Sequence, residues 1–555
     1  MIDRLVLKFG AGSGEPPLEL APTAITVFVG PNNSGKSKAI AEIAAQCTNG
    51  TSNHSDVILD KINFSNEYSD VDEFIKGITL PSPTGEPTDP NYIYVRTRGG
   101  GAQNVPLEIV KHALSNPNEA DARAYFAEYY MGGQTLVLNG RNRIDLVNDQ
   151  AGGDLQQRPI TSFQTLFRND DLRKEYSDVV YASLNAHAVI DPTNLGKLRL
   201  RLSPTASSPA LERGLGNDSV AFHSLALPIE RASDGTKAFT GILAEIFAGD
   251  PRILLMDEPE AFLHPSLAFN LGREIAQSLA ATAKRMFVST HSPQFLMGCI
   301  QSGVPLNVVR LTYKDRVPTA RLLPSSDIAK LMRNPLLRST GVISALFFES
   351  VVVTEADPDR AFYQEVNERL LRLGRGIPNC IFLNAQNKQT IPTIISPLRQ
   401  LGIPAAAIYD VDFVKDGGGV ATRFMDAAGI PILAQNGLTS IRAALAIALL
   451  RADGGYKING GIAVLPSDER GAAVDYFDQL DAYGAFVVRG GELESWLKYL
   501  GISGHGPSWL IGMFERMGED PLSVDFISPD DSDVWSFIDS VAAWLRNPDR
   551  KGIPV

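Results

Sequence analysis

Residues that could do phosphate chemistry form three groups along this chain of 555 residues. The first is the segment Gly30-Pro-Asn-Asn-Ser-Gly-Lys-Ser37, which matches G-x-x-x-x-G-K-[ST] in full. The second is the pair Asp257 and Glu258, directly after the apolar run 253–256. The third is a set of carboxylates between residues 355 and 412. The first two groups are typical of a nucleoside triphosphate site and the third of a divalent-metal site, so the chain is predicted to couple ATP to metal-dependent phosphodiester chemistry.

The glycine-rich segment has the surroundings that a phosphate-binding loop requires. The run Ile25–Val29 predicts a strand that leads into it, and a helix is predicted from about Ser37 to Gln46. Backbone N–H groups of such a loop surround the β- and γ-phosphates, and the helix N-terminus adds a positive dipole end. A chance glycine-rich turn is the alternative, which the flanking strand and helix disfavour. The predicted ATP ligands are Gly30, Asn32, Asn33, Ser34, Gly35, Lys36 and Ser37, with Lys36 on the phosphate oxygens and the Ser37 hydroxyl on Mg²⁺.

Asp257 and Glu258 are expected to complete this nucleotide site. They stand at the carboxyl end of a predicted buried strand, which is where open α/β sheets bind ligands. Asp257 would hold Mg²⁺, often through water, and Glu258 would be the base or the water-positioning group for attack on the γ-phosphate. Without the glycine loop, the pair could equally be solvated acids at the end of a strand.

The third group is predicted to bind metal through four carboxylates, Glu355, Asp359, Asp410 and Asp412. Glu355 ends one predicted strand and Asp359 begins the following helix, where Asp357 is open to a capping role instead. Asp410 and Asp412 close a second strand, and residues i and i+2 of a strand point the same way, although the strand could end between them. Such carboxylates suit Mg²⁺ or Mn²⁺, and paired ions could activate water and stabilise the leaving oxygen of a phosphodiester.

The elements that position these groups form two α/β patterns. In the first, helices 236–248 and 266–281 alternate with strands 253–256 and 285–289. The second restarts after about residue 345, with strands 350–354, 381–383 and 405–409, helices 359–373 and 390–401, further short strands 462–465 and 485–488, and a terminal helix 532–545. Alternating strands and helices predict mostly parallel sheets, so the fold class is α/β. Residues 50–230 are expected to be an α/β region inserted into the first pattern.

The first pattern resembles the ABC-type ATPase family. Residues 253–260 resemble its Walker B segment, Ser289-Thr-His-Ser292 its switch-histidine segment, and Ser233-Asp-Gly235 a degenerate form of its Ser-Gly-Gly signature. The resemblance implies that Ser233 and Gly235 bind the γ-phosphate held by an opposite subunit. His291 follows a predicted strand, and contact with a γ-phosphate is favoured over a surface or core role. The resemblance therefore implies a homodimer, or a higher homo-oligomer, assembled through the ATPase domains. Glu260 and His264-Pro265 resemble the form of this loop in DNA-associated ATPases rather than transporters.

The second pattern resembles the Toprim domain, in which one strand ends in Glu and a later strand ends in Asp-x-Asp. Ala356 replaces the glycine usual after that Glu, and Asn387-Lys388 keeps a common lysine but loses its glycine. An ABC-type ATPase followed by a Toprim domain is the architecture of the OLD (overcoming lysogenization defect) family nucleases. The resemblance implies an ATPase domain over 1–345, a Toprim domain over 346–500 and a C-terminal helical extension over 501–555. It also implies that Glu355 and Asp410 are catalytic and that Glu494 is a further metal ligand, with Glu492 second and Lys551 a weak candidate near the scissile phosphate.

The resulting prediction is an ATP-dependent, Mg²⁺- or Mn²⁺-dependent endonuclease or nickase that acts on DNA. The family resemblance implies a bacterial or phage setting and a role in anti-phage defence, beside a possible second defence protein. One alternative is a nucleotide sensor whose Toprim domain only scaffolds a partner or toxin. A topoisomerase-like strand passer needs a catalytic tyrosine, and none of the fifteen tyrosines lies in a recognised motif. A primase is disfavoured because the zinc module is missing.

Composition sets the remaining bounds. The content of 44% apolar and 21% charged residues is that of an ordinary globular protein, and the net charge of −12 argues against a uniformly basic nucleic-acid coat. The three cysteines are far apart, which excludes a C-x-x-C zinc or redox motif. No apolar run reaches the roughly 18 residues needed to span a bilayer, and the N-terminus is not a signal peptide, so a cytoplasmic protein without a membrane partner is expected. Two basic runs, 197–201 and 369–375, could follow DNA phosphates but are more often solvated faces.

Overall fold

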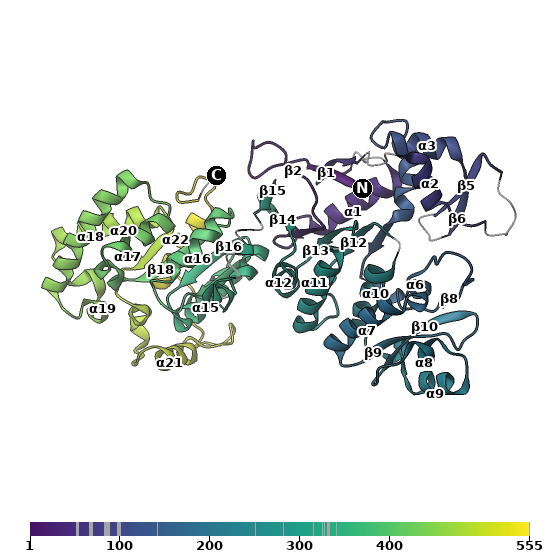
Figure 1. Cartoon of the computed structure of the whole chain (residues 1–555). Coiled ribbons are helices and arrows are strands. Elements are labelled where there is room, and N and C mark those ends of the chain that lie inside the picture. Colours follow the sequence, from purple (N-terminus) through teal and green to yellow (C-terminus); the bar gives the residue numbers. More distant parts are fainter. Residues whose placement is uncertain are drawn as a thin grey trace. The chain divides into compact units, whose positions relative to one another are not determined.

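The chain folds into two compact units, Met1–Ala329 and Lys330–Val555, in a computed structural model (Figure 1). The structure describes residues 1–553 except 51–54, 66–69, 83–88, 97–100, 141, 250, 281, 315, 325, 327, 330–332 and 340. The division falls before residue 345, so the segment that follows Ala329 belongs with the second unit.

A six-stranded sheet organises the first unit, in the order β15-β14-β3-β13-β12-β7. Its strands are β15 (Val317–Leu323), β14 (Leu306–Lys314), β3 (Ile25–Val29), β13 (Arg285–Ser289), β12 (Ile253–Asp257) and β7 (Thr135–Leu138). All neighbours are parallel except the β14–β15 hairpin. Because parallel strands end at the same edge, the residues that follow β3, β12 and β13 come together there.

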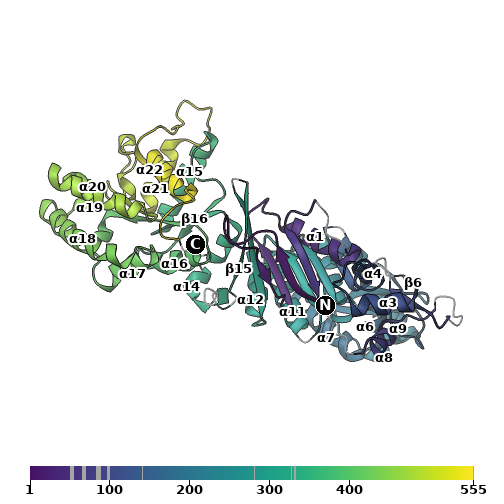
Figure 2. The ribbon, with the colours of Figure 1, turned by 90° about the horizontal axis from the view of Figure 1, so that it is seen from above.

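Helices cover both faces of this sheet. The strands lie between α1 (Lys36–Asn49) and α11 (Pro265–Ala280) in Figure 2. Ile40 and Ile43 of α1 share a core with Leu255 and Phe287 of the sheet. Each central strand is therefore buried on both faces, which explains its continuous apolar sequence. Helix α12 (Pro293–Gln301) follows β13, and helix α10 (Asp234–Ala248) precedes β12.

Smaller elements lie outside the main sheet, most of them in the region 50–230 that was expected to be an insertion. A three-stranded sheet joins β2 (Glu19–Leu20), β1 (Ile2–Leu7) and β4 (Leu59–Phe64), and a hairpin joins β5 (Tyr92–Arg96) to β6 (Ala102–Pro106). Helices α2 (Val71–Ile78), α3 (Leu107–Ser115) and α4 (Arg123–Tyr129) accompany them. Beyond β7 come α5 (Asn142–Asp145), α6 (Ser162–Arg168), α7 (Asp170–Leu184) and a second small sheet, which contains β8 (Gln150–Ala151), β9 (His187–Asp191), β10 (Lys197–Ser203) and β11 (Leu227–Pro228).

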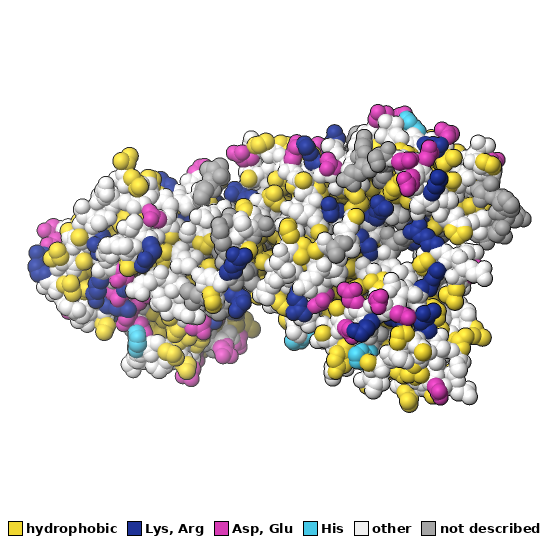
Figure 3. Space-filling model, viewed as in Figure 1, with side chains coloured by type: hydrophobic (Ala, Val, Ile, Leu, Met, Phe, Trp, Pro, Cys, Tyr) yellow, Lys and Arg dark blue, Asp and Glu magenta, His cyan; other side chains and the backbone are white. Residues whose placement is uncertain are grey.

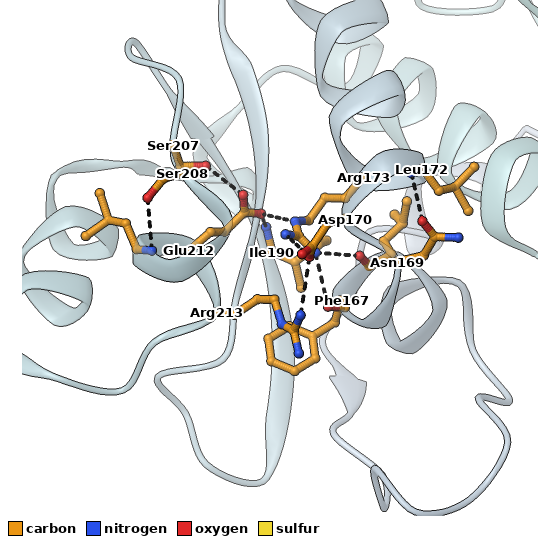
Figure 4. Close-up of polar contacts among 12 residues, drawn as sticks. Phe167, Asn169, Asp170, Leu172, Arg173, Ile190, Ser207, Ser208, Glu212 and Arg213 are labelled. Carbon is orange, nitrogen blue, oxygen red and sulfur yellow. Dashed lines mark hydrogen bonds and ion pairs between the residues drawn. The ribbon is translucent and has the colours of Figure 1, made fainter.

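Buried ion pairs hold this second small sheet to its helices. Arg173 of α7 is 3% exposed, and its Nε lies 3.3 Å from an oxygen of Glu212 in α8 (Pro209–Arg213) (Figure 4). Asp170 accepts from the same guanidinium at 2.7 Å. The backbone N–H of Ile190 in β9 donates to Glu212 at 2.7 Å, so one carboxylate joins helix and strand. The last helix of this part is α9 (Asn217–Leu225).

The second unit is built on a four-stranded parallel sheet, in the order β17-β16-β18-β19. Its strands are β17 (Cys380–Asn384), β16 (Ser350–Thr354), β18 (Ala405–Asp410) and β19 (Ala485–Val488), and α15 (Asp357–Arg372) and α16 (Ile391–Gln400) connect the first three. The C-terminal helices α21 (Pro507–Met517) and α22 (Asp533–Arg546) are part of this core. Their Trp509 and Trp535 are fully buried against it, so residues 501–553 fold together with the sheet.

A helical segment separates β18 from β19. It contains α17 (Gly419–Ala427), α18 (Ile432–Ala452), α19 (Tyr456–Asn459) and α20 (Ser467–Asp481). The expected strand 462–465 is wrong, because Gly461–Val464 forms a 3₁₀ helix. Gly460 and Gly461 have φ of 122° and 61°, so the backbone turns there instead of extending.

Among the described residues, α18 alone has the length and apolar composition to cross a membrane. The helix spans 21 residues, whereas the sequence was expected to hold no such segment. Its sequence is interrupted by polar residues, and the guanidinium of Arg442 donates to the Val414 carbonyl at 2.6 Å. Leu438, Leu445 and Leu449 on the same side are buried, so this side of α18 packs on the unit.

Candidate nucleotide and metal sites

The glycine-rich loop lies between β3 and α1, as the sequence predicted. Gly30 has φ of 141°, and a Cβ there would lie 2.0 Å from the Leu311 carbonyl of β14, so only glycine fits this bend. Ser34 is buried, whereas Asn32, Asn33 and Ser37 are exposed around the helix start. Gly35 immediately precedes α1, so the free N–H groups of its first turn face the loop.

Lys36 is the first residue of α1 and is 4% exposed. Its ammonium donates to the carbonyls of Gly30 at 2.9 Å and Pro31 at 2.6 Å. Burial lowers the pKa of Lys36 to about 8, although the carboxylates of Glu258, Asp257 and Glu260 oppose that shift. The positive charge is thus held inside the loop and beside the acids that follow β12.

Asp257 and Glu258 lie at the end of β12, which is separated from β3 and its glycine-rich loop by β13. Asp257 is in register with Ser289 of β13, and the Ser289 hydroxyl donates to the Asp257 carboxylate. Glu258 has φ of 52°, an unusual conformation for a residue with a side chain, and its N–H donates to the Ser289 carbonyl at 2.9 Å. Its carboxylate remains 45% exposed, so it is available to a ligand at this edge of the sheet.

His291 follows β13 and faces Glu258. Its Nε2 lies 3.5 Å from a Glu258 oxygen, and its backbone N–H donates to the Glu260 carboxylate at 2.8 Å. Burial and the charge of Lys36 lower the pKa of His291, against the effect of Glu258. The sequence singled out Glu260 only as part of a loop; the structure shows that it orients the histidine segment.

The signature-like residues Ser233 and Gly235 begin α10. Ser233 is exposed and caps the helix, since its hydroxyl accepts from the Thr236 N–H at 3.2 Å. Asp234, which departs from the usual signature, pairs with Lys237 at 3.2 Å. This helix N-terminus is open to solvent, whereas Lys36 and Asp257 belong to the edge of the main sheet.

In the second unit, Glu355, Asp410 and Asp412 converge. One carboxylate oxygen from each lies within 4.8 Å of the others. Glu355 follows β16, and its carboxylate accepts from the Asp410 N–H at 2.9 Å. β18 ends at Asp410, and Asp412 lies in the 3₁₀ helix Val411–Lys415. The strand therefore ends between the two aspartates, which is one of the two possibilities that the sequence left open, and a tight turn rather than a shared strand face brings them together.

Asp359 completes this group from the first turn of α15. It accepts from the Ala356 N–H at 3.2 Å, so Asp359, rather than Asp357, is the capping carboxylate. Burial, followed by the charges of Asp410 and Glu494, raises the pKa of Asp359 to about 7. Burial and Asp410 likewise raise the pKa of Glu355 well above its ordinary value. These shifts show that the carboxylates crowd one half-buried volume.

Glu492 and Glu494 approach the same group from the loop after β19. Glu492 lies 3.5 Å from the ammonium of Lys457, which also lies 2.9 Å from Asp410. Glu494 accepts from His505 Nδ1 at 2.8 Å and from the Gly506 N–H at 2.7 Å. Both glutamates and His505 could share a cation, since one ligand atom of each lies within 4.8 Å of the others. Glu492 is the one linked to Asp410, through Lys457.

Two lysines that the sequence did not assign to the site balance its charge. Lys457 comes from the four-residue helix α19, and its pKa is raised because Asp410, Asp412 and Glu492 outweigh its burial. Lys388 lies 3.2 Å from Asp412 and 3.5 Å from Asp416. Lys388 was noticed in its motif, but Lys457 follows Gly454-Gly455 without any pattern that would have identified it.

The donor set fits a hard divalent cation. Six carboxylates contribute oxygen atoms, and one of these, Asp412 Oδ1, is buried without a hydrogen-bond partner. Glu355, Asp410 and Asp412 could hold one ion, and Asp359, Glu492 and Glu494 border it. Mg²⁺ or Mn²⁺ bound there would supply a Lewis acid for phosphodiester cleavage.

The remaining basic residues have structural partners. Lys551 lies over the Tyr483 ring, with its ammonium 5.6 Å from the ring centroid. Arg199 and Arg201 pair with the buried Asp191 at 2.8 and 2.5 Å. Arg369 is buried and donates to the Met517 carbonyl at 3.0 Å. Lys and Arg side chains are interspersed with Asp and Glu over the visible face of each unit (Figure 3). Three arginines of the two basic runs, Arg199, Arg201 and Arg369, therefore have partners within the fold.

The first unit combines a glycine-rich loop after β3, an Asp-Glu pair after β12 and a histidine after β13 at one edge of a parallel sheet. These features define a P-loop ATPase domain of mixed α/β type. Residues 111–297 match the family model described as "AAA domain, putative AbiEii toxin, Type IV TA system". The matched part includes Glu258 and His291. The first unit is thus a P-loop ATPase domain that is similar, over this segment, to the AAA domain model.

Solved structures with a similar chain path include three heads of SMC proteins. One, bound to the C-winged helix domain of ScpA, is 16% identical, with a TM-score of 0.34 over 60% of this chain and 99% of that chain. The head from Thermotoga maritima is 13% identical, with a TM-score of 0.30 over 58% and 99%. The head from Pyrococcus furiosus, with an extended coiled coil and bound to the C-terminal domain of ScpA, is 13% identical, with a TM-score of 0.34 over 60% and 98%. No curated protein matches the chain in sequence.

Proposed function

We propose that this chain is an ATP-dependent and divalent-metal-dependent DNA endonuclease or nickase of the OLD type. Its first unit binds and hydrolyses ATP, and its second unit is a Toprim nuclease domain that uses Mg²⁺ or Mn²⁺. We further propose a cytoplasmic homodimer, or a higher homo-oligomer, that acts in anti-phage defence, with a second defence protein as an additional partner.

The observation that carries this proposal is the convergence of Glu355, Asp410 and Asp412 at the carboxyl edge of a parallel sheet. Half-buried carboxylates repel one another and resist ionisation unless a cation compensates them. A fold that gathers six of them around two lysines is therefore suited to a metal ion and a polyanion. DNA is such a polyanion, and the charge of its phosphodiester backbone would also be attracted by Lys457 and Lys388.

The proposed roles follow from position. Glu355, Asp410 and Asp412 hold the metal, and Asp359 with Glu492 or Glu494 completes its surroundings. In the first unit Lys36 binds the phosphates, Ser37 and Asp257 hold Mg²⁺, and Glu258 orients the attacking water. Ser233 and Gly235 of a second copy would close the ATP site; in a single chain Ser233 is exposed at the N-terminus of α10, whereas Gly235 is buried.

Plasmid cleavage tests the proposal. Supercoiled DNA is incubated with the full chain, Mg²⁺ or Mn²⁺, with and without ATP, and compared with Asp410→Asn and the control Asp426→Asn. Asp426 is an exposed acid of α17 in the same unit. We expect metal-dependent nicking or linearisation that Asp410→Asn reduces by about 100-fold or more and that the control retains. ATP hydrolysis without cutting in any lane would instead favour a sensor whose second unit only scaffolds a partner.

A further inference from the structure

We propose that Arg143 is a positioning residue for ATP hydrolysis, which fixes the backbone at Asp257 and Glu258 and ties it to helix α10. This inference rests on the ATPase part of the proposed function. It concerns a residue outside every motif, since Arg143 lies in the short helix α5 after β7. Nothing in its sequence surroundings distinguishes Arg143 from the other arginines.

The register of the sheet brings Arg143 to the site. β7 is parallel to β12, and Leu138, its last residue, is in register with Met256. The residues after β7 therefore begin level with Asp257, the next residue of β12. α5 starts four residues beyond Leu138, which places its side chains beside the backbone of the Asp-Glu pair.

The guanidinium of Arg143 donates its hydrogen bonds to backbone carbonyls. Its Nη2 donates to the Asp257 carbonyl at 2.6 Å, its Nη1 donates to the Glu258 carbonyl, and its Nε donates to the Asn139 carbonyl at 3.0 Å. The residue is 2% exposed. The planar guanidinium bonds these three carbonyls from three separate nitrogen atoms held in a fixed geometry, whereas a lysine has a single ammonium nitrogen.

These bonds hold a backbone that would otherwise relax. Glu258 has φ of 52°, a region that residues with side chains avoid, so its conformation depends on surrounding contacts. The Ser289 carbonyl holds its N–H on one side, and Arg143 holds its carbonyl on the other. The Glu258 carbonyl also accepts from the Ala261 N–H at 3.0 Å, and these contacts together set the direction of the Glu258 carboxylate toward the nucleotide edge.

Helix α10 touches the same arrangement at two points. A Cβ on Gly241 would lie 2.8 Å from the Leu146 Cβ and 3.4 Å from the Arg143 carbonyl. A Cβ on Gly235 would lie 2.5 Å from the carbonyl of Phe262, in the turn that follows Glu258. α10 therefore packs directly on α5 and on the loop after β12. A displacement of α10, such as one caused by a second subunit at Ser233, would move Arg143 and with it the Glu258 backbone.

The test separates hydrolysis from ATP binding. Arg143→Lys and Arg143→Gln are compared with wild type and with Arg173→Lys, a buried arginine of the same unit that also donates to backbone carbonyls but lies away from the nucleotide edge. We expect Arg143→Lys to lower kcat by roughly tenfold or more while the Kd for a fluorescent ATP analogue stays within about threefold. The control should leave both within about threefold of wild type.

A second variant perturbs the contact without touching Arg143. Gly241→Ala should push on α5 and lower kcat with an unchanged Kd, in the same way as Arg143→Lys. Equal kcat values for Arg143→Lys and Arg173→Lys would overturn the inference, and so would parallel losses of binding and hydrolysis in every variant that retains a cooperative melting transition. Absence of hydrolysis by the wild-type chain would instead refute the ATPase part of the proposed function.

Discussion

Neutralising Asp359 should stabilise the metal-free protein at alkaline pH. Burial and the nearby charges of Asp410 and Glu494 raise the pKa of this carboxyl from 3.8 to about 7. A carboxyl whose pKa is higher in the folded state binds more protons when folded, so it destabilises the fold as the pH rises from about 4 through about 7. Asp359→Asn removes that ionisation and keeps an oxygen that can accept from the Ala356 N–H.

The size of this stabilisation follows from the shift in the pKa of Asp359. Each pKa unit corresponds to about 1.4 kcal/mol, so the upper limit at pH 8 is roughly 4 kcal/mol. Relaxation and water around a half-buried group reduce this, and we expect about 2–3 kcal/mol, or a Tm increase of about 5–10 °C for a unit of this size. The control is Asp357→Asn, on the same helix turn, whose exposed carboxylate pairs with Arg360; it should stay within about 0.5 kcal/mol of wild type.

Thermal unfolding in EDTA between pH 4 and pH 8 measures the difference in Tm between Asp359→Asn and the wild type. The stabilisation by Asp359→Asn should be near zero at pH 4, grow through pH 7 and then level off. Added Mn²⁺ should stabilise the wild type more than the variant, because the ion compensates the carboxylates. A Tm difference that does not depend on pH, or a loss of stability at pH 8, would show that Asp359 is not held in a crowded acidic volume.

Three further changes test other parts of the structure. Lys36→Ala should weaken binding of a fluorescent ATP analogue by about 100-fold, whereas Lys38→Ala on the exposed side of α1 should bind normally. Gly491→Ala should weaken Mn²⁺ binding, measured by calorimetry, by roughly tenfold or more. A Cβ at this position would lie 2.0 Å from the Lys457 carbonyl and would displace the loop that carries Glu492. The control Gly471→Ala, whose Cβ would lie in open space on α20, should bind Mn²⁺ like the wild type. Arg399→Met should lower the unfolding free energy by about 3 kcal/mol in chemical denaturation, since its buried guanidinium donates to four carbonyls, and an unchanged midpoint would contradict this role.

Local pattern was sufficient for the nucleotide site. The loop 30–37 and the pair Asp257-Glu258 each follow a short apolar strand, and both strands were predicted because a parallel sheet buried on two faces requires continuous apolar sequence. Once those strands are parallel, their ends must meet at one edge. The position of Lys36, Asp257 and His291 follows from that rule with little further information.

The metal group was predicted in part. Glu355, Asp359 and Asp410 follow from strand ends and a helix start in the same way. Asp412 reaches the group by a 3₁₀ turn rather than by strand alternation. Glu492, Glu494, Lys457 and His505 come from segments 45 or more residues beyond Asp412, and only the packing of the helical segment and of α21 decides which of them face Asp410.

The sequence by itself determined that this protein has two α/β units, one with a phosphate-binding loop and one with clustered acids, because strand and helix periods and loop chemistry are local properties. The tertiary structure alone decided which lysines balance those acids, that residues 501–553 join the second core, and that Arg143 supports the backbone of Glu258. Those contacts join residues far apart in the chain, and their partners are backbone carbonyls or lone side chains that carry no sequence pattern.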